Sequence, residues 1–237
     1  MKRFLAISIA LVGFGAIASA DVLTQIADRA AMGSSPTFDT IPWDLNYGPA
    51  VNAIPASDGW TSFGGATGTV TNTSGGSLYR VDDGNGWSGN FDVGEALLWT
   101  ANFETNPPDG MVVTFDTPVN SVGFTIAANF YGTFTGQLEV FGTSGLLGTL
   151  ILNGVENGNG DDSALFMGLL DNSGANITSI DIQTYNSVDI NDFAIDDISM
   201  TSDANTGVPE PGSVVLLASV VLGVAGLLRR RLSGESA

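Results

Sequence analysis

Short apolar runs of strand length, separated by clusters of Gly, Asn, Asp and Ser, recur along this chain and restrict what it can fold into. Val122, Phe124 and Ile126 alternate with small or polar residues, which is the two-residue period of a half-buried strand. Further strands are predicted at residues 137–141, 147–152, 164–170, 177–184 and 192–200. Frequent turns between short strands predict an all-β fold over residues 21–202, an antiparallel β-sandwich or jelly roll.

The first half of this region is less regular. Residues 21–32 are predicted as a short helix that ends at Ser34-Ser35-Pro36. Glycine-rich turns then separate short aromatic strands such as Trp60–Phe63 and Leu97–Trp99. The chain has 31 glycines in 237 residues, about twice the usual ~7% share, which agrees with many turns.

Charge excludes one class of partner. Residues 21–208 hold two basic residues, Arg29 and Arg80, against 23 of the 25 acids, because Glu210 and Glu235 lie later in the chain. The formal balance of about −21 opposes nucleic-acid binding, which depends on Lys and Arg neutralising phosphates. It favours solubility and divalent cations.

The chain contains no cysteine and no histidine. Zinc and copper sites built from thiolate or imidazole are therefore excluded, as are catalytic triads that use histidine. Carboxylate chemistry and oxygen-ligand metals, above all calcium, remain.

The N-terminus reads as an export signal over residues 1–20. Lys2 and Arg3 precede an apolar run from Phe4 to Ile17, and Ala18 and Ala20 supply the small residues of a cleavage site. The mature chain is then expected to begin at Asp21. An uncleaved anchor helix is the alternative.

The C-terminus predicts a second membrane signal. Val208-Pro209-Glu210-Pro211 closes a linker over residues 203–212, and an uncharged apolar segment runs from Ser213 to Leu228 before Arg229, Arg230 and Arg231. Sixteen helical residues span roughly 24 Å, slightly less than the ~30 Å hydrocarbon core. We expect a hydrophobic helix over 213–231 with a cytoplasmic arginine stop and an exported domain. A buried C-terminal helix is the alternative.

This tail resembles the PEP-CTERM sorting signal of bacterial exported proteins. Segments 118–124, 166–168, 177–180 and 193–198 also look like the β-rich ectodomain common in that family. The resemblance implies a precursor anchored in the inner membrane and processed by an exosortase near Pro209–Pro211. It also implies a final place in the cell envelope, at the surface or in the extracellular matrix, in bacteria that export polysaccharide.

Asp196 and Asp197 in the last expected strand form the first candidate site. Because neighbouring side chains of a strand point to opposite faces, one carboxylate points toward the core unless a bulge intervenes. A buried carboxylate needs a cation or several donors, so we predict a structural calcium here. The strand also resembles the last strand of carbohydrate-binding jelly rolls, which often hold calcium at this place. Backbone amides that satisfy a strand-end Asp are the alternative.

Two loops compete as metal sites. Residues 82–85 and 157–162 are dense in oxygen ligands, but neither fits the EF-hand loop, so plain solvated turns are the stronger interpretation. Among the aromatic residues of the first half, Trp87 between glycines is the one predicted to be exposed and to stack on a sugar, although aromatic residues usually fill cores.

Three functions follow from these patterns. The first is a non-catalytic cell-surface or matrix protein associated with exopolysaccharide. The second is a carbohydrate-binding module for a defined glycan. The third is a glycoside hydrolase that uses paired carboxylates, for which 23 acids give abundant pairs but no specific signal.

Overall fold

The computed structural model describes residues 23–101, 110–186 and 192–202, which form two β-sheets and two short helices. The first sheet contains β1 (Leu23–Gln25), β2 (Phe38–Ile41), β3 (Asn52–Ile54), β6 (Leu78–Asp83), β7 (Gly86–Trp87), β8 (Ala96–Trp99), β10 (Ser121–Ala128), β13 (Leu165–Asp171), β15 (Phe193–Ile195) and β16 (Ile198–Thr201). The second contains β4 (Ser57–Thr61), β5 (Thr67–Asn72), β9 (Met111–Val119), β11 (Gly132–Gly142), β12 (Gly145–Glu156) and β14 (Ile177–Asn186). The helices are α1 (Arg29–Met32) and α2 (Trp43–Tyr47).

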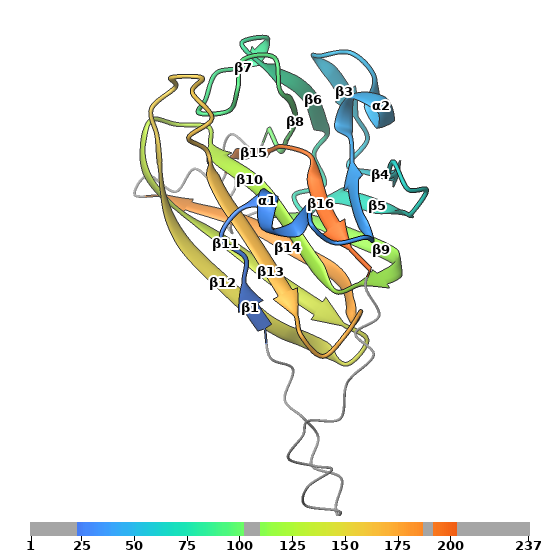
Figure 1. The fold of residues 1–237 in the computed structure, drawn as a ribbon. Helices are drawn as coiled ribbons and strands as arrows, with labels where there is room; N and C mark the ends of the chain where they lie inside the picture. Colours follow the sequence, from blue (N-terminus) through green and yellow to red (C-terminus); the bar gives the residue numbers. More distant parts are fainter. Residues whose placement is uncertain (1–22, 102–109, 187–191, 203–237) are drawn as a thin grey trace, which may run out of the picture.

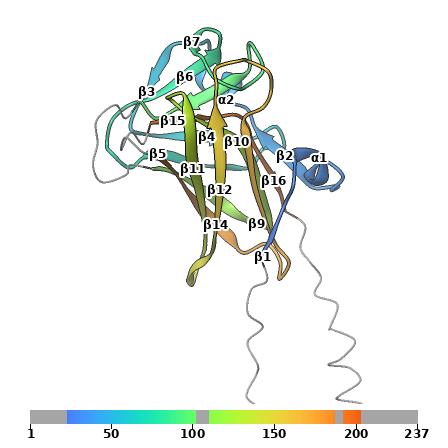
Figure 2. The same cartoon turned by 90° about the vertical axis from the view of Figure 1, so that its left-hand side faces the viewer.

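The predicted all-β sandwich is confirmed. One hydrophobic core takes side chains from both sheets, including Phe124 and Ile126 of β10 and Leu138 and Val140 of β11. The pairings are antiparallel except for that of β6 with the two-residue β7. Figures 1 and 2 show the two sheets face to face, with the short strands β3, β6 and β7 at one end.

The predicted helix over residues 21–32 is wrong. Within its described part, β1 pairs with β13 at the edge of the first sheet, and only Arg29–Met32 is helical. Asp28 caps this turn by accepting a hydrogen bond from the backbone N–H of Ala31 at 2.8 Å. Pairing with a sheet edge thus overrides the weak helical preference of the segment.

The last strand of the first sheet is split at Asp196 and Asp197. β15 and β16 both pair with β10, but the chain takes four residue steps from Ile195 to Ser199 while β10 takes three from Ile126 to Gly123. The extra residue is a β-bulge, which bends the strand and breaks its ladder. As a result the sheet forks: β15 continues to β8, β6 and β3, whereas β16 continues to β2.

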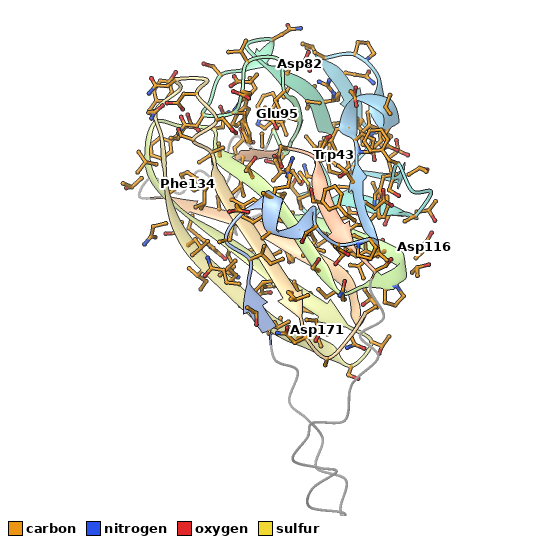
Figure 3. All side chains as sticks on the ribbon, viewed as in Figure 1. Trp43, Asp82, Glu95, Asp116, Phe134 and Asp171 are labelled. Atoms are coloured by element: carbon orange, nitrogen blue, oxygen red, sulfur yellow. The ribbon has the colours of Figure 1, made fainter. Side chains whose placement is uncertain are left out.

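Both ends of the described domain lie at one end of the sandwich. Leu23 pairs with Asp171, and Thr201 pairs with Ser121, which itself faces Leu170. Figure 3 shows Asp171 at this lower end and Asp82 and Glu95 near the opposite, upper end.

The expected signal peptide and the sorting tail, with Val208–Pro211 and Arg229–Arg231, lie outside the described residues. Among the helices that are described, none is long and apolar enough to cross a membrane.

Candidate functional site

An aromatic hollow of about 480 Å³ lies at the upper end of the sandwich. It is formed where β7, the end of β8 and the turn between β10 and β11 meet. Its lining residues are Gly86, Trp87, Ser88, Trp99, Asn129, Phe130 and Tyr131. The volume falls in the usual range for a small-ligand site, and aromatic walls with a few polar groups are typical of such sites.

Trp87 forms the floor of this hollow, and the prediction that it is exposed is wrong. Its side chain is 5% exposed and packs in a small hydrophobic cluster with Val81, Phe91 and Leu97. Its ring meets Trp99 edge to face, with ring centroids 5.8 Å apart. Stacking of a sugar on Trp87 stays a prediction, and the contact would be limited to the edge that reaches the hollow.

The walls are fixed by a buried carboxylate. Asp192 accepts hydrogen bonds from Trp99 Nε1 at 2.7 Å, Thr100 Oγ1 at 2.8 Å and Asn129 Nδ2 at 2.7 Å. The backbone N–H of Asn129 also donates to the Asp192 carbonyl. Because hydrogen bonds to a carboxylate are directional and strong, they orient the Trp99 indole and the Asn129 amide.

Tyr131 offers the most accessible aromatic face, with 64% of the side chain exposed. A Cβ added to Gly158 would lie 2.5 Å from its ring, so the loop carrying this glycine passes directly against Tyr131. With half-buried Phe130 and Trp99 beside it, the hollow presents ring faces next to an amide and a hydroxyl. Such a surface suits the apolar face and the hydroxyl groups of a sugar ring.

Asp196 and Asp197 lie at the fork of the first sheet. Asp196, 2% exposed, forms an ion pair with Arg29 of α1 and accepts a hydrogen bond from the Thr125 backbone N–H at 2.7 Å. Asp197 accepts one from the Trp43 backbone N–H at 3.0 Å. The Trp43 indole donates to the Asp196 carbonyl at 2.7 Å. These contacts tie α1, α2 and β10 to the closing strand.

The structure therefore gives Asp196 an arginine partner, which the sequence reasoning did not assign to it. Calcium at Asp196 and Asp197 stays a prediction. Within the described parts of the chain, no group of three or more Asp or Glu side chains is arranged to hold a metal ion.

An acidic pocket of about 450 Å³ opens beside this ion pair. It is lined by acidic side chains including Asp92, Glu95, Asp162 and Asp196, with Arg29 between them. Burial raises the pKa of Glu95 to about 7, and the neighbouring charge of Asp196 adds to the rise. Burial likewise raises the pKa of Asp196 to about 6, although Arg29 and the Thr125 hydrogen bond lower it. A carboxyl group with a raised pKa is what a glycosidase acid needs, and the hydrolase alternative stays a hypothesis.

The two loops that competed as metal sites lie against each other. We call residues 83–90 and 156–163 the rim loops. Asn90, which is 1% exposed, joins them: its Oδ1 accepts hydrogen bonds from the backbone N–H groups of Asn157 and Gly158, and its Nδ2 donates to the Val155 carbonyl. The Gly160 N–H donates to the Gly89 carbonyl at 2.8 Å.

Each rim loop carries one buried carboxylate, Asp83 at 4% and Glu156 at 2% exposure. Burial raises the pKa of Glu156 to about 7 against the lowering effect of hydrogen bonds from Gly158, and the charge of Asp83 raises it further. Burial also raises the pKa of Asp83.

Sequence reasoning missed Asn129, Phe130 and Tyr131 as parts of a site, because it considered aromatic residues only in the first half. The available signal was an Asn-Phe-Tyr-Gly turn between two strands, where large aromatic side chains cannot be buried by alternation. The strand predicted at residues 147–152 ends too early, because β12 extends to Glu156 and buries it.

Comparison with known proteins does not place the chain in a family. No protein-family model and no curated protein matches the chain. Among solved structures, the chain is similar to the K2 cleaved adhesin domain of Lys-gingipain, with 17% identity, a TM-score of 0.27, and coverage of 76% of this chain and 99% of that domain.

Proposed function

We propose that this protein is an exported, non-catalytic component of the cell surface or extracellular matrix that associates with polysaccharide through the aromatic hollow. The observation that carries the proposal is the set of aromatic rings of Trp99, Phe130 and Tyr131 that line the hollow. Asn129 and Ser88 line it beside them, and Asp192 accepts hydrogen bonds from Trp99 and Asn129. The location follows from the export signal expected at residues 1–20 and the PEP-CTERM-like tail with its exosortase motif.

The geometry supports this placement. The chain ends that connect to both expected membrane signals leave from the lower end, whereas the hollow lies at the upper end. A domain attached at its lower end presents the hollow away from the membrane. The succession of β9 to β15 between the two sheets also favours the jelly-roll topology of carbohydrate-binding modules.

Charge limits the glycans that fit. With about −21 formal charges over residues 21–208, the domain repels polyanions through the field of its whole surface. We therefore expect neutral polysaccharides to bind through ring stacking and hydrogen bonds. Acidic ones should bind only at high ionic strength or through a bridging cation.

Binding of the purified full-length chain to neutral and anionic polysaccharides on an array, followed by calorimetry, tests this proposal. Tyr131→Ala removes the most exposed ring of the hollow and should weaken binding about 2- to 10-fold, as expected for an aromatic contact of roughly 0.5–1.5 kcal/mol. Phe63→Ala is the matched control, because Phe63 is 68% exposed in the turn between β4 and β5. Equal affinity of both variants and the wild type, or no binding to any glycan, would refute the proposal.

A further inference from the structure

Buried acids in the described part of the domain are neutralised in two ways, with one exception. Asp196 pairs with Arg29, and the buried Arg80 pairs with the half-buried Asp82 at 2.5 Å. Asp192 and Asp171, both fully buried, instead accept hydrogen bonds from neutral groups, such as Ser173 and Asn176 at Asp171. These arrangements meet the requirement that a charge taken out of water be paired or hydrogen-bonded.

Asp83 and Glu156 are the exception. Each uses one carboxylate oxygen: Asp83 Oδ1 accepts from the Gly89 N–H at 3.2 Å, and Glu156 Oε1 accepts from the Gly158 N–H at 2.7 Å. The other oxygens, Asp83 Oδ2 and Glu156 Oε2, are buried and have no hydrogen-bond partner among the described residues. An orphaned buried oxygen on a charged group costs several kcal/mol.

The two orphaned oxygens lie on either side of the Gly160–Gly89 hydrogen bond that joins the rim loops. Glu156 Oε2 lies 3.3 Å from the position that a Cβ on Gly89 would take, and the N–H of the same glycine contacts Asp83. On the other side, Asp83 Oδ2 and the Phe91 carbonyl oxygen each lie 3.7 Å from the Cβ position of Gly160. The Trp87 indole fills the Gly89 side of this contact, and Val93 lies on the Gly160 side.

No basic side chain remains to neutralise them. Residues 21–208 contain only Arg29 and Arg80, and both are engaged with other aspartates. The two carboxyl groups are then neutralised either by protonation or by a cation from solution. Carboxylate and carbonyl oxygens are the ligands that calcium prefers, and the unpartnered Trp87 Nε1 lies beside Glu156 Oε2.

We propose that Asp83 and Glu156 bind a calcium ion between the rim loops, with loop carbonyls and solvent completing its coordination. The ion joins β6 to the end of β12 and fixes the loop segment that carries Trp87 and Ser88. This site is separate from the calcium predicted at Asp196 and Asp197, and it does not depend on polysaccharide binding.

Thermal unfolding of the full-length chain in excess chelator and in calcium tests the site. Calcium at about 100 times its Kd should raise the melting temperature by roughly 5–10 °C. Asp83→Asn and Glu156→Gln should each abolish this gain. Asp161→Asn, an exposed acid in the same rim loop, and Asp196→Asn should keep it.

Two further readouts separate binding from mere damage to the fold. Glu156→Gln removes an unpaired buried charge, so in chelator it should melt no lower than the wild type. Terbium in place of calcium should emit on tryptophan excitation, because Trp87 lies next to Glu156. Trp87 Nε1 is 2.4 Å and Glu156 Oε2 is 3.3 Å from the position that a Cβ on Gly89 would take. Trp87→Phe should reduce that emission and leave the calcium gain in melting temperature.

An unchanged melting temperature of the wild type in calcium would overturn the proposal. So would a calcium gain that survives in Glu156→Gln but disappears in Asp196→Asn, which would place the ion at the fork instead. Because glycan binding is measured separately with Tyr131→Ala, either proposal can fail alone.

Discussion

Replacement of Arg29 by methionine tests the electrostatics at the fork of the first sheet. The arginine is 34% exposed while its partner Asp196 is 2% exposed, so the variant leaves a buried carboxylate without its cation. Breaking a buried pair costs about 3–5 kcal/mol, and the partial exposure of Arg29 places this case at or below the lower limit. The methionine side chain keeps most of the apolar contact made by the arginine stem.

The cost should depend on pH in a defined direction. The folded-state pKa of Asp196 is raised to about 6, above the unfolded value of about 3.9. The folded state therefore holds the proton more tightly, and this group's contribution to stability falls as the pH rises from about 4 to 6 in the wild type. Without Arg29 the pKa rises further, so in the variant the fall continues to higher pH.

The magnitude follows from these values. At about pH 5 Asp196 is mostly protonated in both proteins, and the variant loses little electrostatic energy. At about pH 8, two units above the wild-type pKa of Asp196, the loss in the free energy of unfolding of the variant relative to the wild type should be up to about 2.7 kcal/mol larger than at about pH 5. Each pKa unit corresponds to about 1.36 kcal/mol.

Urea unfolding at both pH values, in chelator to exclude bound metal, gives the free energies of unfolding that are needed. Arg29→Met combined with Asp196→Asn is the control: with no carboxylate left at residue 196, most of the extra loss at high pH should disappear. An equal penalty at both pH values would refute the reasoning.

Three further predictions concern processing, packing and catalysis. Mass spectrometry of the exported protein should show a chain that begins at Asp21 and lacks Arg229–Arg231, and recovery of these arginines from the surface form would contradict exosortase processing. Gly68→Ala should destabilise the domain by roughly 1–3 kcal/mol or more in urea unfolding, because its Cβ would lie 1.9 Å from a β9 carbonyl oxygen. Gly59→Ala on β4, with 3.8 Å to the nearest atom, should cost under about 1 kcal/mol. Assays on soluble polysaccharides should show no hydrolysis, and turnover that Glu95→Gln abolishes without unfolding the domain would establish the hydrolase alternative.

Much of the sandwich could be predicted from the sequence. The runs at residues 137–141, 147–152 and 177–184 correspond to β11, β12 and β14, each longer in the structure than in the prediction. Alternation identifies such strands because burial of one face imposes a two-residue period. It does not find their ends, where the ladder continues into Gly and Asn residues that propensity assigns to turns.

The features that periodicity missed depend on partners far along the chain. Residues 23–25 form a strand because β13 offers an open edge, and nothing in the local sequence shows that edge. The bulge at Asp196 and Asp197 exists only relative to β10, whose shorter path defines the extra residue. The sequence did indicate that one of these acids needs a partner, but the choice of Arg29 required the fold.

The candidate sites likewise combine features that the local sequence indicated with features that depend on partners far along the chain. Composition indicated an acidic domain suited to divalent cations, and local patterns pointed to residues 82–85, residues 157–162 and Trp87, although plain solvated turns were the preferred interpretation of the two loops. Sequence alone treated the loops as competitors, because their distance in space is set by the pairing of β6 and β12 with other strands. It misjudged Trp87 because flanking glycines suggest exposure, whereas here they let Val81, Phe91 and Leu97 close around the ring.

The position of the rim loops gives a physical reason for a metal ion at this end. The second loop has left-handed backbone at Gly158 and Gly160, with φ of 70° and 59°, so it has more conformational freedom to lose on ordering than most loops. A cation held by Asp83 and Glu156 would offset that loss on the side facing the aromatic hollow. With such an ion the two ends of the sandwich would be stabilised differently: strand pairing fixes the lower end near the chain termini, and ligation would fix the upper end, where loops carry the residues of the aromatic hollow.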